Sequence, residues 1–202
     1  MKTLFFLFSL SFLEIGKCPN QSPSTYFAYK TLKQAIYPLS KNNKIKSKNG
    51  RLDIITKNGI KVRFSDQTSG ADEMSTKTYE YIGDIQSINS SFVNEMGYEI
   101  GSVIMITRSG DKIRVWDAPY VSQDATLAVS LSQSIDSELA PNGIQVLTLN
   151  NGEVVSKCDL YIKHLEPQDI RWINNASFII KFQVFTEEGN RINKFVYKKY
   201  II

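Results

Sequence analysis

The chain has 202 residues, of which 42% are hydrophobic, 11% aromatic and 22% charged, and its formal net charge is +4 at pH 7. This composition suffices for one folded domain with a proper core, and it excludes wholesale disorder. No stretch after the N-terminus approaches the roughly twenty apolar residues of a transmembrane helix.

Residues 1–17 are predicted to be an export signal. Lys2 supplies the positive start, and residues 4–13, LFFLFSLSFL, are uncharged and rich in Leu and Phe. That length is typical of the apolar region of a signal peptide and is too short to span a bilayer. We therefore expect an exported protein that is periplasmic, membrane-anchored or extracellular.

The two cysteines, Cys18 and Cys158, leave several fates open. Residues 15–18, IGKC, resemble a bacterial lipoprotein box, which predicts lipidation of Cys18, although Lys17 stands where a small residue is normal. An oxidising compartment allows a Cys18–Cys158 disulfide instead, and Cys158 also suits burial as a small apolar residue. With one histidine, His164, and no Cys-x-x-Cys, we expect no metal and no cofactor.

Residues 18–51 form a basic segment. It holds seven Lys or Arg and no acid. The net charge without residues 1–17 is +3, so the chain from Leu52 onward carries −4. A basic arm on an acidic body suits membrane association, through Cys18 and this segment, or binding to an envelope polymer; a solvated surface is the plain alternative. Export excludes nucleic acid as the expected partner.

A short helix is predicted within this segment, over residues 25–37. Ser24 or Thr25 is a suitable N-cap, and Pro38 is placed to end the helix. Its apolar face is predicted to comprise Ala28, Leu32, Ala35, Ile36 and Leu39.

From Leu52 to the end, residues 52–202, the pattern changes to that of strands. Residues 52–56 and 60–64 alternate and flank Asn58-Gly59, the strongest short-range signal of a hairpin. Further strands are predicted over residues 103–107, 112–116, 127–131, 144–149, 169–172, 177–184 and 194–200, with turns around Gly110, Gly152 and Gly189.

Three segments share a plan of short strand, polar turn, apolar strand, loop and glycine hairpin. They begin at residues 85–92, 120–127 and 170–178, and units of 40 to 50 residues are typical of propeller blades. Residues 119–129, PYVSQDATLAV, and 142–153, NGIQVLTLNNGE, resemble the strand start and closing hairpin of TolB-type and WD-repeat β-propellers. Gln123 and Ala125 depart from that pattern, replacing a proline and a glycine.

This resemblance, shared with small exported bacterial proteins of unknown function, implies an all-β fold. We expect three to four propeller-like blades or stacked antiparallel sheets, open or closed, with the short N-terminal helix. It implies recognition rather than catalysis, since no catalytic residue carries over.

The residues offer weak candidates for a binding site. Trp116, Tyr120 and Trp172 are flat side chains suited to a sugar or peptide, or else core anchors. Asp136 and Glu138 are candidates for a pocket or a cation, although they lack calcium-loop spacing. His164 is the one candidate for proton transfer near neutral pH, but a surface or hydrogen-bonded structural role is the preferred interpretation.

The sequence thus predicts an exported, non-enzymatic protein of the bacterial envelope that binds a protein or glycan partner. One alternative is a hydrolase of envelope polymers that uses carboxylates such as Asp136, Glu138 or Asp169. Another is a structural lipoprotein held at the membrane by Cys18 and the basic segment.

Overall fold

The computed structural model describes residues 14–15, 18–33, 39–42, 45, 47–67, 76–98, 101–135 and 140–202. Strands dominate these residues, so the predicted all-β class is confirmed. None of the helices formed by the described residues is long and apolar enough to cross a membrane. The elements are β1 (Glu14–Ile15), β2 (Asn20–Ser24), α1 (Tyr26–Lys30), β3 (Arg51–Ile55), β4 (Lys61–Ser65), β5 (Thr78–Ile85), the 3-10 helix η2 (Gln86–Ile88), β6 (Ser90–Met96), β7 (Gly101–Ile106), β8 (Lys112–Val115), β9 (Tyr120–Val121), β10 (Leu127–Ser132), β11 (Gly143–Asn150), β12 (Glu153–Tyr161), β13 (Leu165–Asn174), β14 (Ser177–Phe185) and β15 (Arg191–Ile201).

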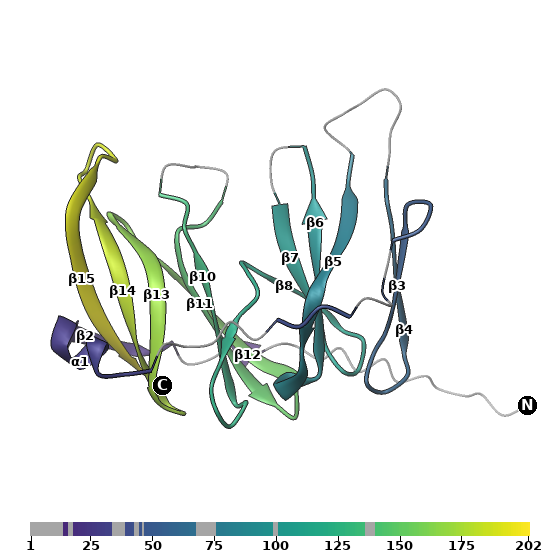
Figure 1. The fold of residues 1–202 in the computed structure, drawn as a ribbon, viewed down its shortest axis with the longest axis horizontal. Coiled ribbons are helices and arrows are strands. Elements are labelled where there is room, and N and C mark those ends of the chain that lie inside the picture. Colours follow the sequence, from purple (N-terminus) through teal and green to yellow (C-terminus); the bar gives the residue numbers. More distant parts are fainter. Residues whose placement is uncertain are drawn as a thin grey trace, which may run out of the picture.

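The described strands make four sheets. Their strand orders are β3-β4, β5-β6-β7-β8, β9-β10-β11-β12-β1 and β13-β14-β15-β2. Pairing is antiparallel except between β1 and β12. Figure 1 shows these sheets standing in a row, with β3-β4 at one end and the β13-β14-β15-β2 sheet at the other. The described part of the chain is therefore an open stack of sheets.

Each junction between neighbouring sheets is filled by its own apolar cluster. Leu52, Phe64 and Ile104 belong to the cluster between the first two sheets. Phe92 and Leu147 belong to the next. The cluster between the last two sheets contains Ile144, Val146, Ile170, Phe178, Ile180, Phe182 and Tyr200. The two middle sheets thus bury both faces, which is why β7, β10 and β11 have mostly consecutive buried residues.

Three hairpins use the same Thr-x-x-Gly turn, including the predicted Asn58-Gly59 hairpin, which is confirmed. In each, the glycine N–H donates to the threonine carbonyl, at 2.9, 3.0 and 3.1 Å, and the threonine hydroxyl accepts from the N–H four residues on, at 3.2 Å. The glycines have positive φ, which other residues adopt at a cost. The turns begin at Thr56, Thr107 and Thr186.

The turn before β10 also needs a residue with positive φ, but here that residue is an alanine. Ala125, at the place of the propeller-family glycine, has a φ of 59°. Asp124 accepts from the Ser122 hydroxyl at 2.8 Å and from the Thr126 N–H at 3.2 Å. Burial alone would raise the pKa of Asp124, but these hydrogen bonds outweigh it and hold the pKa below its usual value. The turn is fixed by its side chains.

The N-terminal residues join the C-terminal half of the chain. β2 lies beside β15, with Ser24 opposite Tyr197 and Asn20 opposite Ile201, so it completes the last sheet. Pro23 is tolerated because β2 is an edge strand. Cys18 is bonded to Cys158 of β12, with Cα atoms 5.4 Å apart. The sequence predicted this disulfide only as one of several alternatives. The bond ties the last two sheets together.

The helix differs from the prediction. Thr25 caps it, since its hydroxyl accepts from Ala28 N–H at 3.2 Å, but it ends at Lys30 rather than continuing toward residue 37. Residues 34–38, including Pro38, lie outside the described part. The buried side chain is Tyr29, not the predicted Ala28 and Leu32 face, because Tyr29 packs 5.0 Å from the Tyr197 ring. Tertiary packing overrides the helical pattern here.

The disulfide predicts a measurable loss of stability on reduction. Cys18 and Cys158 are 140 residues apart, and closing so long a loop restricts the unfolded chain. We expect the double variant Cys18→Ser, Cys158→Ser to lose on the order of 4 kcal/mol in urea unfolding. Reductant should give the same loss in the parent and none in the variant. Equal stability of the parent with and without reductant would contradict the bond.

A pair of glycine variants measures the contact between sheets. A Cβ on Gly152 (φ +81°) would lie 2.2 Å from the Ile88 carbonyl oxygen, whereas one on Gly59 (φ +78°) would meet nothing within 4 Å. Gly59→Ala should cost about 1 kcal/mol from its backbone alone. Gly152→Ala should cost at least about 2 kcal/mol more, because neighbouring sheets must separate. Equal losses in chemical denaturation would count against close packing at this turn.

Candidate functional site

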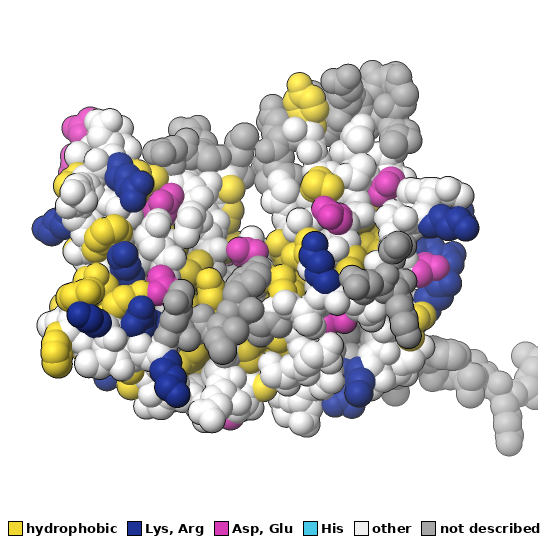
Figure 2. Space-filling model, viewed as in Figure 1, with side chains coloured by type: hydrophobic (Ala, Val, Ile, Leu, Met, Phe, Trp, Pro, Cys, Tyr) yellow, Lys and Arg dark blue, Asp and Glu magenta, His cyan; other side chains and the backbone are white. Residues whose placement is uncertain are grey.

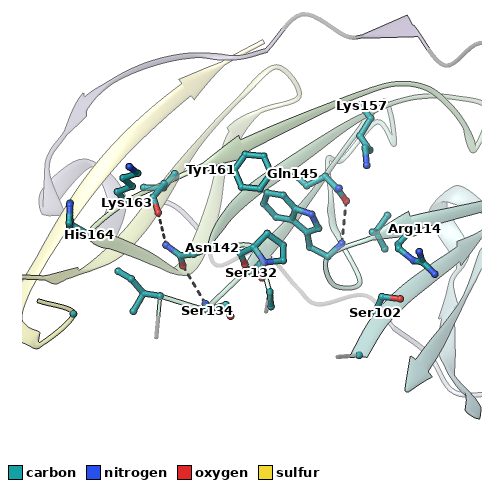
Figure 3. A pocket seen from close by; sticks show the side chains of 18 of the residues that line it. Ser102, Arg114, Ser132, Ser134, Asn142, Gln145, Lys157, Tyr161, Lys163 and His164 are labelled. Carbon is teal, nitrogen blue, oxygen red and sulfur yellow. Dashed lines mark hydrogen bonds between the residues drawn. The ribbon is translucent and has the colours of Figure 1, made fainter. Parts of the chain in front are cut away.

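A pocket of about 960 Å³ lies where the β5–β8 sheet, the β9–β12 sheet, the loop before β13 and the loop after β14 meet. Trp116, Gln145 and Tyr161 are on its walls. Figure 3 shows Tyr161 beside Gln145, with Lys157 and Arg114 to one side and Lys163 and His164 to the other. The pocket draws its lining from segments that are far apart in the sequence.

An aromatic pair is the main apolar feature of this pocket. Trp116 directly follows β8, and Tyr161 ends β12. Their ring centroids are 5.4 Å apart and their planes differ by 53°. Tyr161 is 71% exposed, although it touches another aromatic ring. A large ring held against a neighbour yet open to solvent is available for a ligand.

Gln145 of β11 fixes the position of Trp116. Its side chain is fully buried between the apolar residues Ile144 and Val146. The Oε1 atom accepts from the Trp116 backbone N–H at 3.3 Å, and the Nε2 atom donates to Asp159 Oδ1 at 2.9 Å. A buried amide needs such partners, so Gln145 joins the end of β8 to the third sheet.

Asn142 has the same role at the other side of the pocket. Its Nδ2 donates to the carbonyls of Ile162, at 2.7 Å, and Leu165, at 3.0 Å, while its Oδ1 accepts from Ser134 N–H at 3.3 Å. These bonds hold the loop before β11 against the connection between β12 and β13. The two amides are thus engaged in building the walls.

The charges around the pocket largely cancel. Arg114 donates to Glu95 at 2.6 Å, and Lys157 lies 3.4 Å from Asp159. Lys163 and Glu187 also line the pocket and have opposite charges. The site is therefore polar at its rim without a strong net charge.

His164 lies at this rim, in the left-handed region with a φ of 57°. Its Nδ1 is 3.3 Å from the Thr186 carbonyl oxygen, and the side chain is exposed. This contact joins the start of β13 to the turn after β14, which is a structural role.

The structure separates the aromatic candidates. Trp116 lines the pocket. Trp172 and Tyr120 pack instead against the cluster between the last two sheets, with Trp172 edge-on to Phe178 at 5.2 Å. Burial raises the pKa of the Tyr120 phenol, in keeping with that packed position. Trp172 and Tyr120 therefore serve the core.

Among the remaining candidates, the described residues place none at the pocket. Asp136 and Glu138 lie outside the described residues, although Ile135 and Ala140 on either side of them line the pocket. The Cys18 sulfur proposed for lipidation is the one bonded to Cys158. A sulfur atom in a disulfide cannot also carry a lipid thioether.

Sequence reasoning missed two residues of this site, Gln145 and Tyr161. The sequence did contain a signal for Gln145, because an amide between apolar residues of a buried strand needs hydrogen-bond partners. Tyr161 carried no such signal, because its exposure depends on where β12 ends.

No protein-family model, curated protein or solved structure matches the chain. What the fold and site define is therefore a class only, an all-β chain of stacked antiparallel sheets with a pocket between them. Within the described residues, no three His, Cys, Asp or Glu side chains stand close enough together to hold a metal ion.

The wall built by Gln145 can be tested by mutation. Gln145→Ala leaves the Trp116 N–H and the Asp159 carboxylate without this partner, so we expect a loss of about 1 to 3 kcal/mol in unfolding free energy. In a Trp172→Phe background, Trp116 is the remaining one of the chain's two tryptophans. Its emission should shift as the residue moves. Unchanged stability together with unchanged emission would show that Gln145 does not position Trp116.

Proposed function

We propose that this protein is an exported, non-enzymatic binding protein of the bacterial cell envelope, and that its pocket binds a saccharide chain. The observation that carries this proposal is the aromatic pair of half-buried Trp116 and exposed Tyr161, beside walls whose amides are already engaged.

The chemistry of the pocket favours a sugar ring. The C–H bonds on one face of a sugar carry slight positive charge, which complements the negative face of an aromatic ring. Hydroxyl groups at the edge of the sugar can both donate and accept hydrogen bonds. The rim offers Arg114, Lys157 and Lys163 as donors and Glu187 as an acceptor.

The charge balance favours a neutral sugar over a polyanion. The cations of Arg114 and Lys157 are each accompanied by an acid, at 2.6 and 3.4 Å. A polyanion would have to compete with Glu95 and Asp159 for these groups, whereas hydroxyl groups bind beside them.

Export is supported by two features. The N-terminal sequence is typical of a signal peptide, and disulfides such as Cys18–Cys158 persist in oxidising compartments. The propeller-like blades stay part of the same proposal, supported by the row of antiparallel sheets and by the Ala125 turn.

Saccharide binding can be followed through Trp116. The Trp172→Phe protein should change its fluorescence when titrated with neutral oligosaccharides, and saturate. Tyr161→Ala should weaken the affinity at least about tenfold, because it removes an exposed ring that stacks on the ligand. Tyr26→Ala removes a similarly exposed tyrosine, 57% exposed, from the far end of the molecule and should leave the affinity unchanged.

Other outcomes contradict parts of the proposal. Equal affinity in the Tyr161 and Tyr26 variants would exclude the aromatic pair as the binding surface. Release of reducing ends from the same oligosaccharides, lost on mutation of Asp136 or Glu138, would favour the hydrolase instead.

A further inference from the structure

The outer side of the last sheet, together with α1, has an unusual composition. We call this surface the C-terminal face; it comprises α1 and the outward side chains of β14 and β15. The two segments that supply most of it, residues 18–33 and 191–202, contain no acid. The cations of the face are Lys30 of α1, Lys199 of β15 and Lys181 of β14, whereas Lys194 and Lys198 lie on the inner side of β15 with Val196 and Tyr200. These cations stand out because the region from Leu52 onward, which includes β14 and β15, is net acidic.

The same segments expose large hydrophobic side chains. Phe27 is 78% exposed and Tyr26 is 57% exposed. Thirteen large hydrophobic side chains are exposed among the described residues, and six of them lie in these two segments. Besides Tyr26 and Phe27, these are Ile192, Phe195, Ile201 and Ile202. Single exposed apolar residues need no explanation, but a group of this kind marks an interaction surface.

Cations and rings are interleaved on this face. The Lys181 ammonium lies 3.8 Å from the Phe195 ring centroid, and that of Lys30 lies 5.9 Å from Tyr26. Tyr26 in turn contacts Tyr197 at 5.8 Å. Figure 2 shows yellow and dark blue side chains side by side at this end of the molecule. The basic and apolar groups therefore form one surface.

The acids on this side of the sheet are engaged. Asp169 accepts from the Tyr29 hydroxyl and lies 3.7 Å from Arg171 Nε. Glu166 accepts from Gln168 at 2.9 Å. Burial, with the bond to Asp169, raises the pKa of Tyr29. Arg171 also donates to the Leu32 carbonyl at 2.8 Å, so these residues hold α1 on the sheet.

The opposite end of the row provides a contrast. There the outward cations Lys61 and Arg63 both bind Asp53, at 2.7 and 2.8 Å. The exposed apolar residues of that end are Ile55 and Ile60, without an aromatic ring. Its surface is basic too, but it lacks the exposed rings.

We propose that the C-terminal face docks on the surface of an anionic lipid bilayer. Aromatic rings prefer the headgroup region of a membrane, where one edge stays hydrated. Each lysine near an anionic surface adds about fivefold to the binding constant. The face combines both groups, with Phe27 and Tyr26 entering the headgroup layer and Lys30, Lys181 and Lys199 next to lipid phosphates. The inference is independent of saccharide binding.

A local reporter separates this face from the apolar N-terminal residues 4–13. In the full chain with Trp116→Phe and Trp172→Phe, we would place one tryptophan by Phe27→Trp or by Ile55→Trp. Vesicles of 70% phosphatidylcholine and 30% phosphatidylglycerol should shift the Phe27→Trp emission to the blue, and brominated lipid should quench it. Ile55→Trp, at the opposite end, should show neither. Circular dichroism checks that both variants fold.

The charge contribution is tested in the parent chain by vesicle sedimentation. Lys181→Gln with Lys199→Gln should reduce partitioning by about 25-fold, from two cations at fivefold each. Lys48→Gln with Lys57→Gln removes the same charge from the β3–β4 end and should change it by less than twofold. High salt should weaken binding of the parent, since exposed charges are screened.

Several results would overturn the proposal. These are equal effects of the two lysine pairs, equal emission shifts at positions 27 and 55, or a Phe27→Trp shift that needs no phosphatidylglycerol. A shift with a soluble anionic polymer but not with vesicles would assign the face to that polymer instead of lipid.

Discussion

The structure depends on burial of apolar side chains on both faces of its two middle sheets. In β7, Val103 and Met105 face the third sheet while Ile104 and Ile106 face the first. In β11, Ile144 and Val146 face the last sheet, whereas Leu147 and Leu149 face the second. A sheet with two apolar faces cannot end the stack, so it requires a partner on each side. The sheets at the two ends turn one face to solvent, and it is there that charged residues alternate with buried ones, as in β4.

The pocket follows from this arrangement. Sheets that pack through their faces leave strand ends and loops to meet at the rim, and Trp116 and Tyr161 lie at such strand ends. The positions of these strand ends are set by Gln145 and Asn142, which form hydrogen bonds to backbone groups and to Asp159. The stacked sheets thus position loops and strand ends whose sequence can vary without loss of the fold. The proposed binding function needs only the side chains of these loops and strand ends. The membrane-docking face likewise requires only the solvent side of an end sheet.

Much of the fold was predictable because it is local. The hairpin around Asn58-Gly59 follows from turn chemistry and alternation within a few residues, and β10 and β11 follow from short apolar runs. β2 was not predictable, since NQSPS has no pattern of its own and becomes a strand only by pairing with β15. The same applies to the site. Trp116 was singled out as an aromatic residue, but its pairing with Tyr161 depends on which sheets are neighbours, and Trp172 looked equivalent although it belongs to the core.

The pairing of β2 with β15 has a consequence for how the chain folds. Hairpins such as β3–β4 join residues close in sequence and can form within microseconds, whereas Ser24 and Tyr197 must find each other across almost the whole chain. The last sheet is therefore the slowest to be completed. Until that moment the long edge of β15 stays open to any other strand, so the partly folded chain is prone to β-aggregation. An early Cys18–Cys158 bond would act on this interval by shortening the search.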